Sequence, residues 1–210
     1  MEEYICIDAI QHFTQPKHIV TLQQFLFRSR SYTPLPFVVV MFVWAQPTPQ
    51  SLLTGGCIAL LGECFRAWGV SYAGSETRTT GSVGASKLVT SGPFAHVRNP
   101  LYCGNIILYI GLGIMSNALF PYLQLIAFMY FIFQYILIVR EEEMFLRKTF
   151  GDEYLHYCDV VPRFFPRLTK YPNPHQIQSD WKSALRSETR TLQALLFVVV
   201  ILIIRWKLRY

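Results

Sequence analysis

The chain has 210 residues, of which 52% are hydrophobic and only 15% are charged, well below the roughly 25% of charged residues in typical soluble domains. A chain of this length has too little interior to bury so much apolar surface, so lipid must be the solvent for much of it. The net charge of +6 does not indicate a nucleic-acid partner, because the basic residues lie at the ends of apolar segments rather than along one stripe. In such positions they orient a membrane protein and contact anionic lipid headgroups.

The five cysteines form no CxxC or CxxH pair, so we expect neither a disulfide nor a bound metal. Residues 1–33 lack a basic leader with a continuous apolar core, and they predict an interfacial N-terminal lead-in rather than a cleavable signal. A first apolar segment runs from about Pro34 to Ala45, and Pro47 and Pro49 mark an uncharged turn after it.

A second apolar segment covers roughly 51–72 and contains Glu63 and Arg66. Because these two residues are three apart, we predict that they pair on one face of a helix. Polar groups at this depth usually face protein rather than lipid. Residues 74–92 are rich in glycine, serine and threonine and predict a long loop, and a loop of this length in a compact protein is usually functional or disordered.

Two further apolar segments, 101–115 and 120–139, are separated by Ser116-Asn117, with Pro121 just inside the second. This pattern predicts a helical hairpin. Its arms, about 22 and 30 Å long at ~1.5 Å per residue, can cross a bilayer together. Both outer ends of the hairpin then return to one membrane face, which predicts that the segments 97–102 and 140–157 meet there.

Charges accumulate after this hairpin, and Gly151 is expected to end the first helix beyond the membrane. Residues 168–190 predict a polar linker, and residues 191–210 a C-terminal hydrophobic helix. We expect this helix to cross the membrane, and a re-entrant or interfacial helix is the alternative. The positive-inside rule places the charged ends of the hairpin in the cytoplasm. The expected fold is all-α, a polytopic membrane helical bundle of about five transmembrane segments whose main domain covers 34–167.

The chain has no GxGxxG after a strand, no P-loop, no HExxH and no GxSxG elbow, which argues against the common nucleotide-binding and hydrolytic enzymes. Two polar segments remain, 86–102 and 142–157, one at each end of the hairpin. Taken singly, Arg98 is typical of a snorkelling membrane anchor and Tyr102 of an interfacial aromatic residue. Their combination, in fixed order with a carboxylate pair after the hairpin, favours a functional site.

The segments LVTSGPFAHVRNPLY (88–102) and EEMFLRKTFGDEYLHYCDVVPRFFP (142–166), joined by an apolar hairpin, resemble the isoprenylcysteine carboxyl methyltransferase family and its phospholipid N-methyltransferase relatives. The likeness covers roughly 86–167, and both halves and their separation agree. It implies an integral membrane methyltransferase that uses S-adenosylmethionine, with this cofactor enclosed between loop and hairpin at the cytoplasmic face. Membrane lipid and a lipophilic or small-molecule methyl acceptor are the implied partners.

The same resemblance implies which residues bind the cofactor. They are Lys87, Leu88, Val89, Phe94, Arg98, Asn99, Pro100, Tyr102, Glu142 and Glu143, and Arg98 and Glu142 are also the candidate catalytic residues. The backbone of 87–89 is expected to contact the cofactor, and Phe94 to pack on it. The arginine fork suits a bidentate contact with a carboxylate of the cofactor or the substrate.

Three departures from the family pattern bear on the acceptor. Phe94 stands where the family often has tyrosine, Asn99 replaces the histidine of the eukaryotic enzymes, and Ile138 lies one turn before Glu142, where those enzymes place a substrate-guiding arginine. A small lipid, isoprenoid or thiol acceptor is therefore expected at least as much as a prenylated protein. The alternatives are a phospholipid or amine N-methyltransferase, a thiol S-methyltransferase, and a non-enzymatic transporter subunit or scaffold. A transporter should show repeated halves, and the sequence shows no such internal symmetry.

Overall fold

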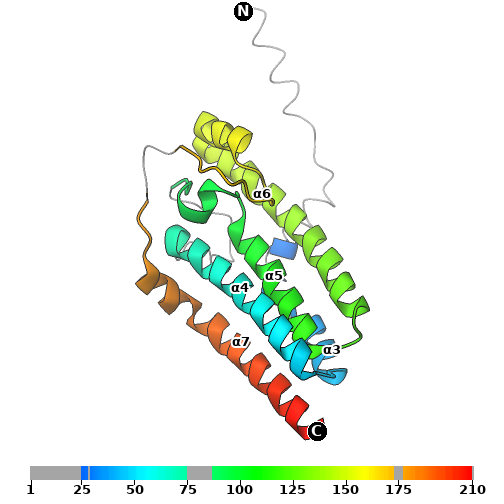
Figure 1. The fold of residues 1–210 in the computed structure, drawn as a ribbon. Helices are drawn as coiled ribbons and strands as arrows, with labels where there is room; N and C mark the ends of the chain where they lie inside the picture. The colour runs from blue at the N-terminus through cyan, green and yellow to red at the C-terminus, as the bar shows by residue number, and fades with distance from the viewer. Residues whose placement is uncertain (1–24, 28, 75–86, 173–176, 210) are drawn as a thin grey trace, which may run out of the picture.

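The computed structural model describes residues 25–27, 29–74, 87–172 and 177–209, and within these ranges every regular element is helical. In chain order the elements are α3 (Leu35–Val43), α4 (Pro49–Ala73), the short 3-10 helix η2 (Gly92–Ala95), α5 (Pro100–Ser116), α6 (Tyr122–Val160) and α7 (Trp181–Arg209). Figure 1 shows α5 between α4 and α6, with α7 running along α4. The all-α prediction is confirmed for this part of the chain, whereas most of the expected lead-in and of the 74–92 loop lies outside the described residues.

Helix α4 begins with a reciprocal cap. The N–H of Ser51 donates to Thr48 Oγ1 at 3.1 Å, and the N–H of Thr48 donates to Ser51 Oγ at 2.9 Å. Pro49 occupies the first helical position, where the N–H that proline lacks would have no helical partner in any case. The helix therefore starts two residues ahead of the apolar segment that predicted it.

Helices α4 and α5 approach so closely that only glycine fits at their contact. A Cβ atom on Gly111 would lie 2.3 Å from the backbone nitrogen of Ala59, and one on Gly62 would lie 2.5 Å from that of Leu108. A Cβ atom on Gly104 would lie 2.9 Å from the carbonyl oxygen of Gly62. Small residues at such spacing let membrane helices bring their backbones together, and this contact sets the position of α5.

The hairpin predicted from the two apolar segments is confirmed as α5 and α6. Helix α5 ends at Ser116, and Asn117 follows in the left-handed conformation, with φ 50°, as is common after helix C-termini. Helix α6 extends beyond its apolar part and is broken at Gly151, whose φ of 52° favours glycine. The predicted end of a helix at Gly151 is thus confirmed as a kink, and residues 152–160 turn back over the open end of the hairpin (Figure 1).

Helix α7 begins at Trp181, so the prediction of a polar linker over 168–190 is wrong for its last ten residues. The cause is a local cap together with a tertiary contact. Asp180 Oδ1 accepts a hydrogen bond from the N–H of Ser183 at 3.0 Å, which satisfies one donor of the first turn. The N–H of Asp180 donates to the carbonyl oxygen of Ser71 at 2.7 Å and so ties the start of α7 to the end of α4.

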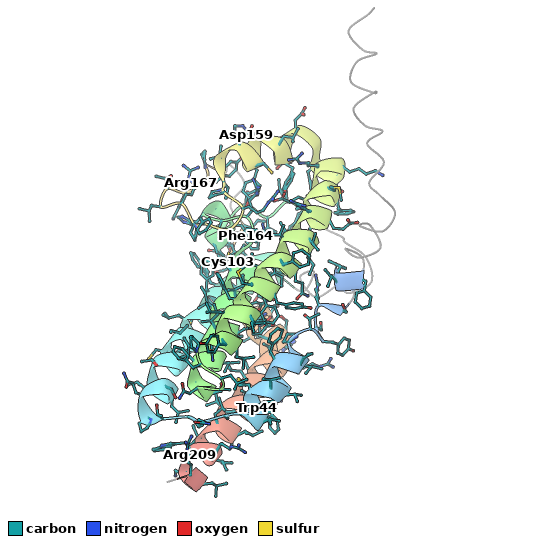
Figure 2. All side chains as sticks on the ribbon, turned by 90° about the vertical axis from the view of Figure 1, so that its right-hand side faces the viewer. Trp44, Cys103, Asp159, Phe164, Arg167 and Arg209 are labelled. Carbon is teal, nitrogen blue, oxygen red and sulfur yellow. The ribbon has the colours of Figure 1, made fainter. Side chains whose placement is uncertain are left out.

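The far end of α7 lies beside the turn that joins α3 and α4, where Arg205 Nη2 donates to the carbonyl oxygen of Val43 at 3.2 Å. Figure 2 shows Trp44 and Arg209 together at this end of the molecule, with Asp159 and Arg167 at the opposite end. Helix α7 therefore runs the length of the bundle.

Two of the described helices, α6 and α7, are long and apolar enough to cross a membrane. Helix α5 is apolar but has 17 residues, and the nine residues of α3 rise only about 14 Å. The described end of the N-terminal lead-in belongs to the protein core, because Leu26 and Phe27 are buried against Phe131 and Ile138 of α6.

Candidate active site

A cavity of about 890 Å³ lies between residues 27–38, α4, the 87–94 segment, α5, α6 and α7. This volume falls within the ~300–1,000 Å³ that is typical of small-molecule sites. The residues predicted to bind a cofactor that line it are Lys87, Leu88, Val89, Phe94, Arg98, Tyr102 and Glu142. Because they come from both ends of the hairpin and the loop before it, the predicted meeting of these segments is confirmed.

Tyr102 and Glu142 join the two arms of the hairpin directly. The Tyr102 hydroxyl donates to Glu142 Oε1 at 2.7 Å, and a hydrogen bond of this length to a carboxylate is charge-assisted. The Tyr102 ring packs against the Tyr135 ring, with their centroids 4.7 Å apart. The contact holds the Glu142 carboxylate at the cavity wall in a defined orientation.

Arg98 and Glu143 form a second contact between the arms. Arg98 Nε donates to Glu143 Oε1 at 3.1 Å, and Arg98 Nη1 donates to the carbonyl oxygens of Cys158 at 2.9 Å and Val161 at 3.1 Å. Arg163 also pairs with Glu143, and its Nε lies 3.1 Å from Oε1. The Glu143 side chain, only 7% exposed, is therefore held by two guanidinium groups.

The electrostatic consequence is clearest at Arg163, where the hydrogen bond with Glu143 raises the pKa of the guanidinium above its ordinary value. In this arrangement the carboxylate that Arg98 orients belongs to the protein itself. The sequence predicted that Arg98 would contact a carboxylate of the cofactor or the substrate, whereas the carboxylate beside Arg98 in the structure is that of Glu143.

Three predicted cofactor residues, Asn99, Pro100 and Glu143, do not line the cavity. Asn99 Nδ2 donates to the carbonyl oxygen of Arg163 at 3.1 Å. Pro100 occupies the first position of α5 and is buried. These residues lie behind the wall of the cavity and connect the start of α5 to the segment that follows α6.

That following segment, residues 161–171, is here called the strap. It runs along the entrance to α5 (Figure 2), where Phe164 lies beside Cys103 and its carbonyl oxygen accepts a hydrogen bond from Cys103 Sγ at 3.3 Å. Three backbone N–H···O hydrogen bonds of 2.9 Å join the strap to residues 95–98, from Arg98 to Pro162, from Arg167 to His96 and from Tyr171 to Ala95. The strap thereby fixes the loop that carries the predicted site residues.

One charged residue that the sequence did not single out, Arg30, also lines the cavity. Its Nη1 lies 3.4 Å from Glu142 Oε1 and 3.4 Å from the Tyr102 hydroxyl. The sequence around Arg30 carries no local pattern that points to α6, so only the tertiary structure reveals this contact.

A second such residue is Glu188 of α7. Glu63 and Arg66 pair as predicted, with Arg66 Nε 3.0 Å from Glu63 Oε2, and Arg66 also forms an ion pair with Glu188. The Glu188 side chain is 2% exposed, and buried acids of this kind nearly always have a charged partner. Glu188 and Asp180 are the only acidic residues after Asp159. The isolated position of Glu188 beside an apolar segment is the one sequence feature that could have indicated a buried ion pair.

Comparison with known proteins gives one match to a family model. Residues 51–153 match the family model described as phospholipid methyltransferase, a stretch that contains most of α4, all of α5, most of α6 and every cofactor residue predicted above. The match supports a methyltransferase associated with membranes, in agreement with the two helices long enough to cross one.

Two individual proteins are also similar. The cobalt-zinc-cadmium resistance protein CzcN of Cupriavidus metallidurans is 31% identical over 150 residues, which cover 71% of this chain and 62% of that protein. The nickel-cobalt-cadmium resistance protein NccN of Alcaligenes xylosoxydans xylosoxydans is 31% identical over 122 residues, which cover 58% of this chain and 53% of that protein. The chain thus spans less than two thirds of the length of both relatives.

Proposed function

We propose that this protein is an integral membrane methyltransferase that uses S-adenosylmethionine and resembles the isoprenylcysteine carboxyl methyltransferases. The observation that carries the proposal is the cavity, because it gathers seven residues that a methyltransferase pattern in the sequence marks as donor-binding. A scaffold would need no such cavity between the two ends of a hairpin. The match of residues 51–153 to phospholipid methyltransferases supports the same class of reaction.

The side chains around the cavity fit the chemistry of this donor, which combines a sulfonium cation, a zwitterionic amino-acid end and a flat adenosine. They include a carboxylate at Glu142, a hydroxyl at Tyr102 and aromatic rings at Phe94 and Tyr157, and aromatic faces attract cations. When bound, the donor supplies a methyl group that passes to a nucleophile without a covalent enzyme intermediate. The chain must align the acceptor and exclude water, and such alignment can contribute as much as ~7–11 kcal/mol.

Within this proposal Glu142 is a ligand-contacting residue and Arg98 is a positioning residue. Glu142 faces the cavity and is oriented by Tyr102. Arg98 also lines the cavity, but its guanidinium is engaged by Glu143 and by two main-chain carbonyls. We therefore expect Arg98 to act by holding α6 and the strap in place around the donor.

For the acceptor we propose a lipophilic or small molecule, with a carboxylate as the favoured methyl-accepting group. Apolar side chains that suit a hydrocarbon tail line the cavity between α5 and α7, among them Leu108, Leu112, Leu195 and Val198. The phospholipid methyltransferase match favours an amine acceptor as the second candidate. The two relatives are named as metal resistance proteins. The growth of a strain that lacks this protein should therefore be compared with that of its parent in cobalt, zinc, cadmium or nickel salts.

The proposal includes about five membrane segments, α3 to α7, and a site at the cytoplasmic face. The number of segments is supported by the position of α4 and α5, which lie alongside α6 and α7, the two helices long enough to cross a membrane (Figure 1). Reporter fusions after Thr169 and after Arg209 should then lie on opposite sides of the membrane, because α7 separates them. Fusions on the same side would contradict a crossing by α7.

Calorimetric titration of the detergent-purified protein with S-adenosylhomocysteine tests the donor site. We expect binding by the wild-type protein, and a loss of binding in Glu142→Gln and Arg98→Ala. Glu153→Gln is the matched control, because Glu153 is an exposed carboxylate of the same helix. If folded wild-type protein gives no binding heat, the proposed cofactor is wrong.

Labelling of native membranes with a methyl-labelled donor identifies the bond that is formed. A carboxyl methyl ester releases its label in mild base, whereas a methylated amine or thioether retains it. Base-labile label would support the carboxylate acceptor, and base-stable label would favour the amine or thiol alternative.

A further inference from the structure

The segment 25–34 contributes a charged group to the cavity, although it lies outside the stretch that matches the methyltransferase family. Arg30 Nη1 lies 3.4 Å from Glu142 Oε1, and the two side chains are only 15% and 24% exposed. A guanidinium group and a carboxylate therefore stand side by side in the wall of the cavity, each close to the Tyr102 hydroxyl.

The segment that carries Arg30 is fixed against α6 from several directions. The Arg30 guanidinium lies over the Phe27 ring, with its carbon 4.4 Å from the ring centroid, a stacked arrangement that restrains the planar group. Phe27 itself is buried against α6. Thr33 Oγ1 accepts a hydrogen bond at 3.0 Å from Nε2 of Gln134, a side chain buried in α6. Arg30 is thus held at the cavity by packing that does not depend on Glu142.

Two of the arginines that line the cavity, Arg98 and Arg30, differ in their distances to protein carboxylates. Arg98 contacts Glu143 at 3.1 Å and two carbonyl oxygens at 2.9 and 3.1 Å. The contacts of Arg30 with Glu142 and Tyr102 are 3.4 Å, beyond the 2.7–3.2 Å typical of well-formed N–H···O hydrogen bonds. The protein carboxylate that a ligand would replace therefore lies farther from Arg30 than from Arg98.

We propose that Arg30 and Glu142 together bind the amino-acid end of the methyl donor, with Arg30 binding the α-carboxylate and Glu142 the α-ammonium group. This inference rests on the proposed function above. The adjacent opposite charges of the protein match the adjacent opposite charges of a zwitterion, so binding leaves neither charge of the amino-acid end without an opposite charge beside it. Tyr102 keeps the Glu142 carboxylate oriented for this contact.

The test compares two ligands that differ in the amino-acid end. Calorimetry on the full-length protein measures S-adenosylhomocysteine, which has this end, and 5′-methylthioadenosine, which lacks it. Because Arg30→Gln removes the charged hydrogen-bond donor of the α-carboxylate, it should weaken the binding of S-adenosylhomocysteine about tenfold or more. Its affinity for 5′-methylthioadenosine should stay within about twofold of wild type, and this retained binding also shows that the variant is folded.

Arg186→Gln is the matched control, because Arg186 is exposed on α7 and does not line the cavity; it should change neither affinity. Arg30→Lys keeps the charge but loses the planar fork, so it should weaken S-adenosylhomocysteine less than the glutamine variant does. If variants that melt like wild type lose affinity equally for both ligands, Arg30 only shapes the cavity and does not bind the amino-acid end, which would overturn the inference. Unchanged affinity for S-adenosylhomocysteine would overturn it as well, while binding by wild type would leave the proposed function standing.

Discussion

The glycine contact between α4 and α5 allows a stability prediction whose size follows from the structure. In Gly111→Ala, the new Cβ would lie 2.3 Å from the backbone nitrogen of Ala59, 2.7 Å from its Cα and 2.8 Å from the carbonyl oxygen of Gly55. All three are backbone atoms, which cannot rotate away as a flexible side chain can. To reach an ordinary contact of 3.4 Å, the two helices must separate by about 1.1 Å.

Overpacking of this kind costs about 1–3 kcal/mol. The higher helix propensity of alanine returns up to about 1 kcal/mol, so we expect a net loss of stability, seen as a lower apparent melting temperature in detergent. Because α5 carries Tyr102, the displacement should also weaken the binding of S-adenosylhomocysteine.

Gly56→Ala is the matched control, since its Cβ would meet only the Met115 side chain, at 3.9 Å. This variant should melt at or above the wild-type temperature, because the added methyl group has room. If Gly111→Ala proves as stable as Gly56→Ala, the close approach of α4 and α5 described here is wrong.

Three further predictions concern single side chains. Glu188→Gln removes one charge of the buried ion pair with Arg66 and should lower stability by at least about 1 kcal/mol, measured by thermal unfolding, with α7 becoming more sensitive to protease. Tyr102→Phe removes the 2.7 Å hydrogen bond to Glu142 and should weaken S-adenosylhomocysteine by about tenfold, with little change in melting temperature. Asp180→Asn tests the cap of α7. The hydrogen bonds to Ser183 lower the pKa of the Asp180 carboxyl below its usual 3.8. The wild-type protein should therefore have a higher melting temperature than the variant at pH 5–7, and this difference should shrink as the pH falls below about 3.8.

Each of these variants has a counterpart that changes the same residue type at an exposed position. Glu153→Gln and Asp152→Asn lie after the kink of α6, and Tyr122→Phe stands at the start of that helix. The three controls should behave like wild type. If a control loses as much stability or affinity as its partner variant, the effect arises from the substitution itself and not from the loss of the contact.

The parts of the site that were predicted correctly are those for which chain topology decides the geometry. An apolar hairpin brings its outer ends to one face, so the meeting of the segments 97–102 and 140–157 follows from topology, and the structure adds the pairs Tyr102–Glu142 and Arg98–Glu143. The pairing of Glu63 with its neighbour on α4 followed in the same way from helical spacing.

The parts that were missed depend on contacts between elements that no local pattern encodes. Residues 181–190 are polar, which favoured a linker, but a cap at Asp180 and the buried ion pair of Glu188 make them helical. Arg30 reaches Glu142 across 112 positions of sequence, and nothing near it specifies that partner. The partner predicted for Arg98 was a carboxylate of a bound ligand. The sequence could not distinguish such a carboxylate from that of Glu143, because both offer the guanidinium the same acceptor oxygens.

The strap has a consequence for how the chain can be divided. The hairpin of α5 and α6 is closed at both ends, covalently through residues 117–121 and non-covalently through the three backbone hydrogen bonds and the Arg98–Glu143 pair. Peptide continuity at the turn is therefore one of two links that hold the two halves of the cavity together. Fragments 1–118 and 119–210, produced in the same cell, should associate into a complex that binds S-adenosylhomocysteine, whereas the same fragments with Arg98→Ala in the first should associate more weakly.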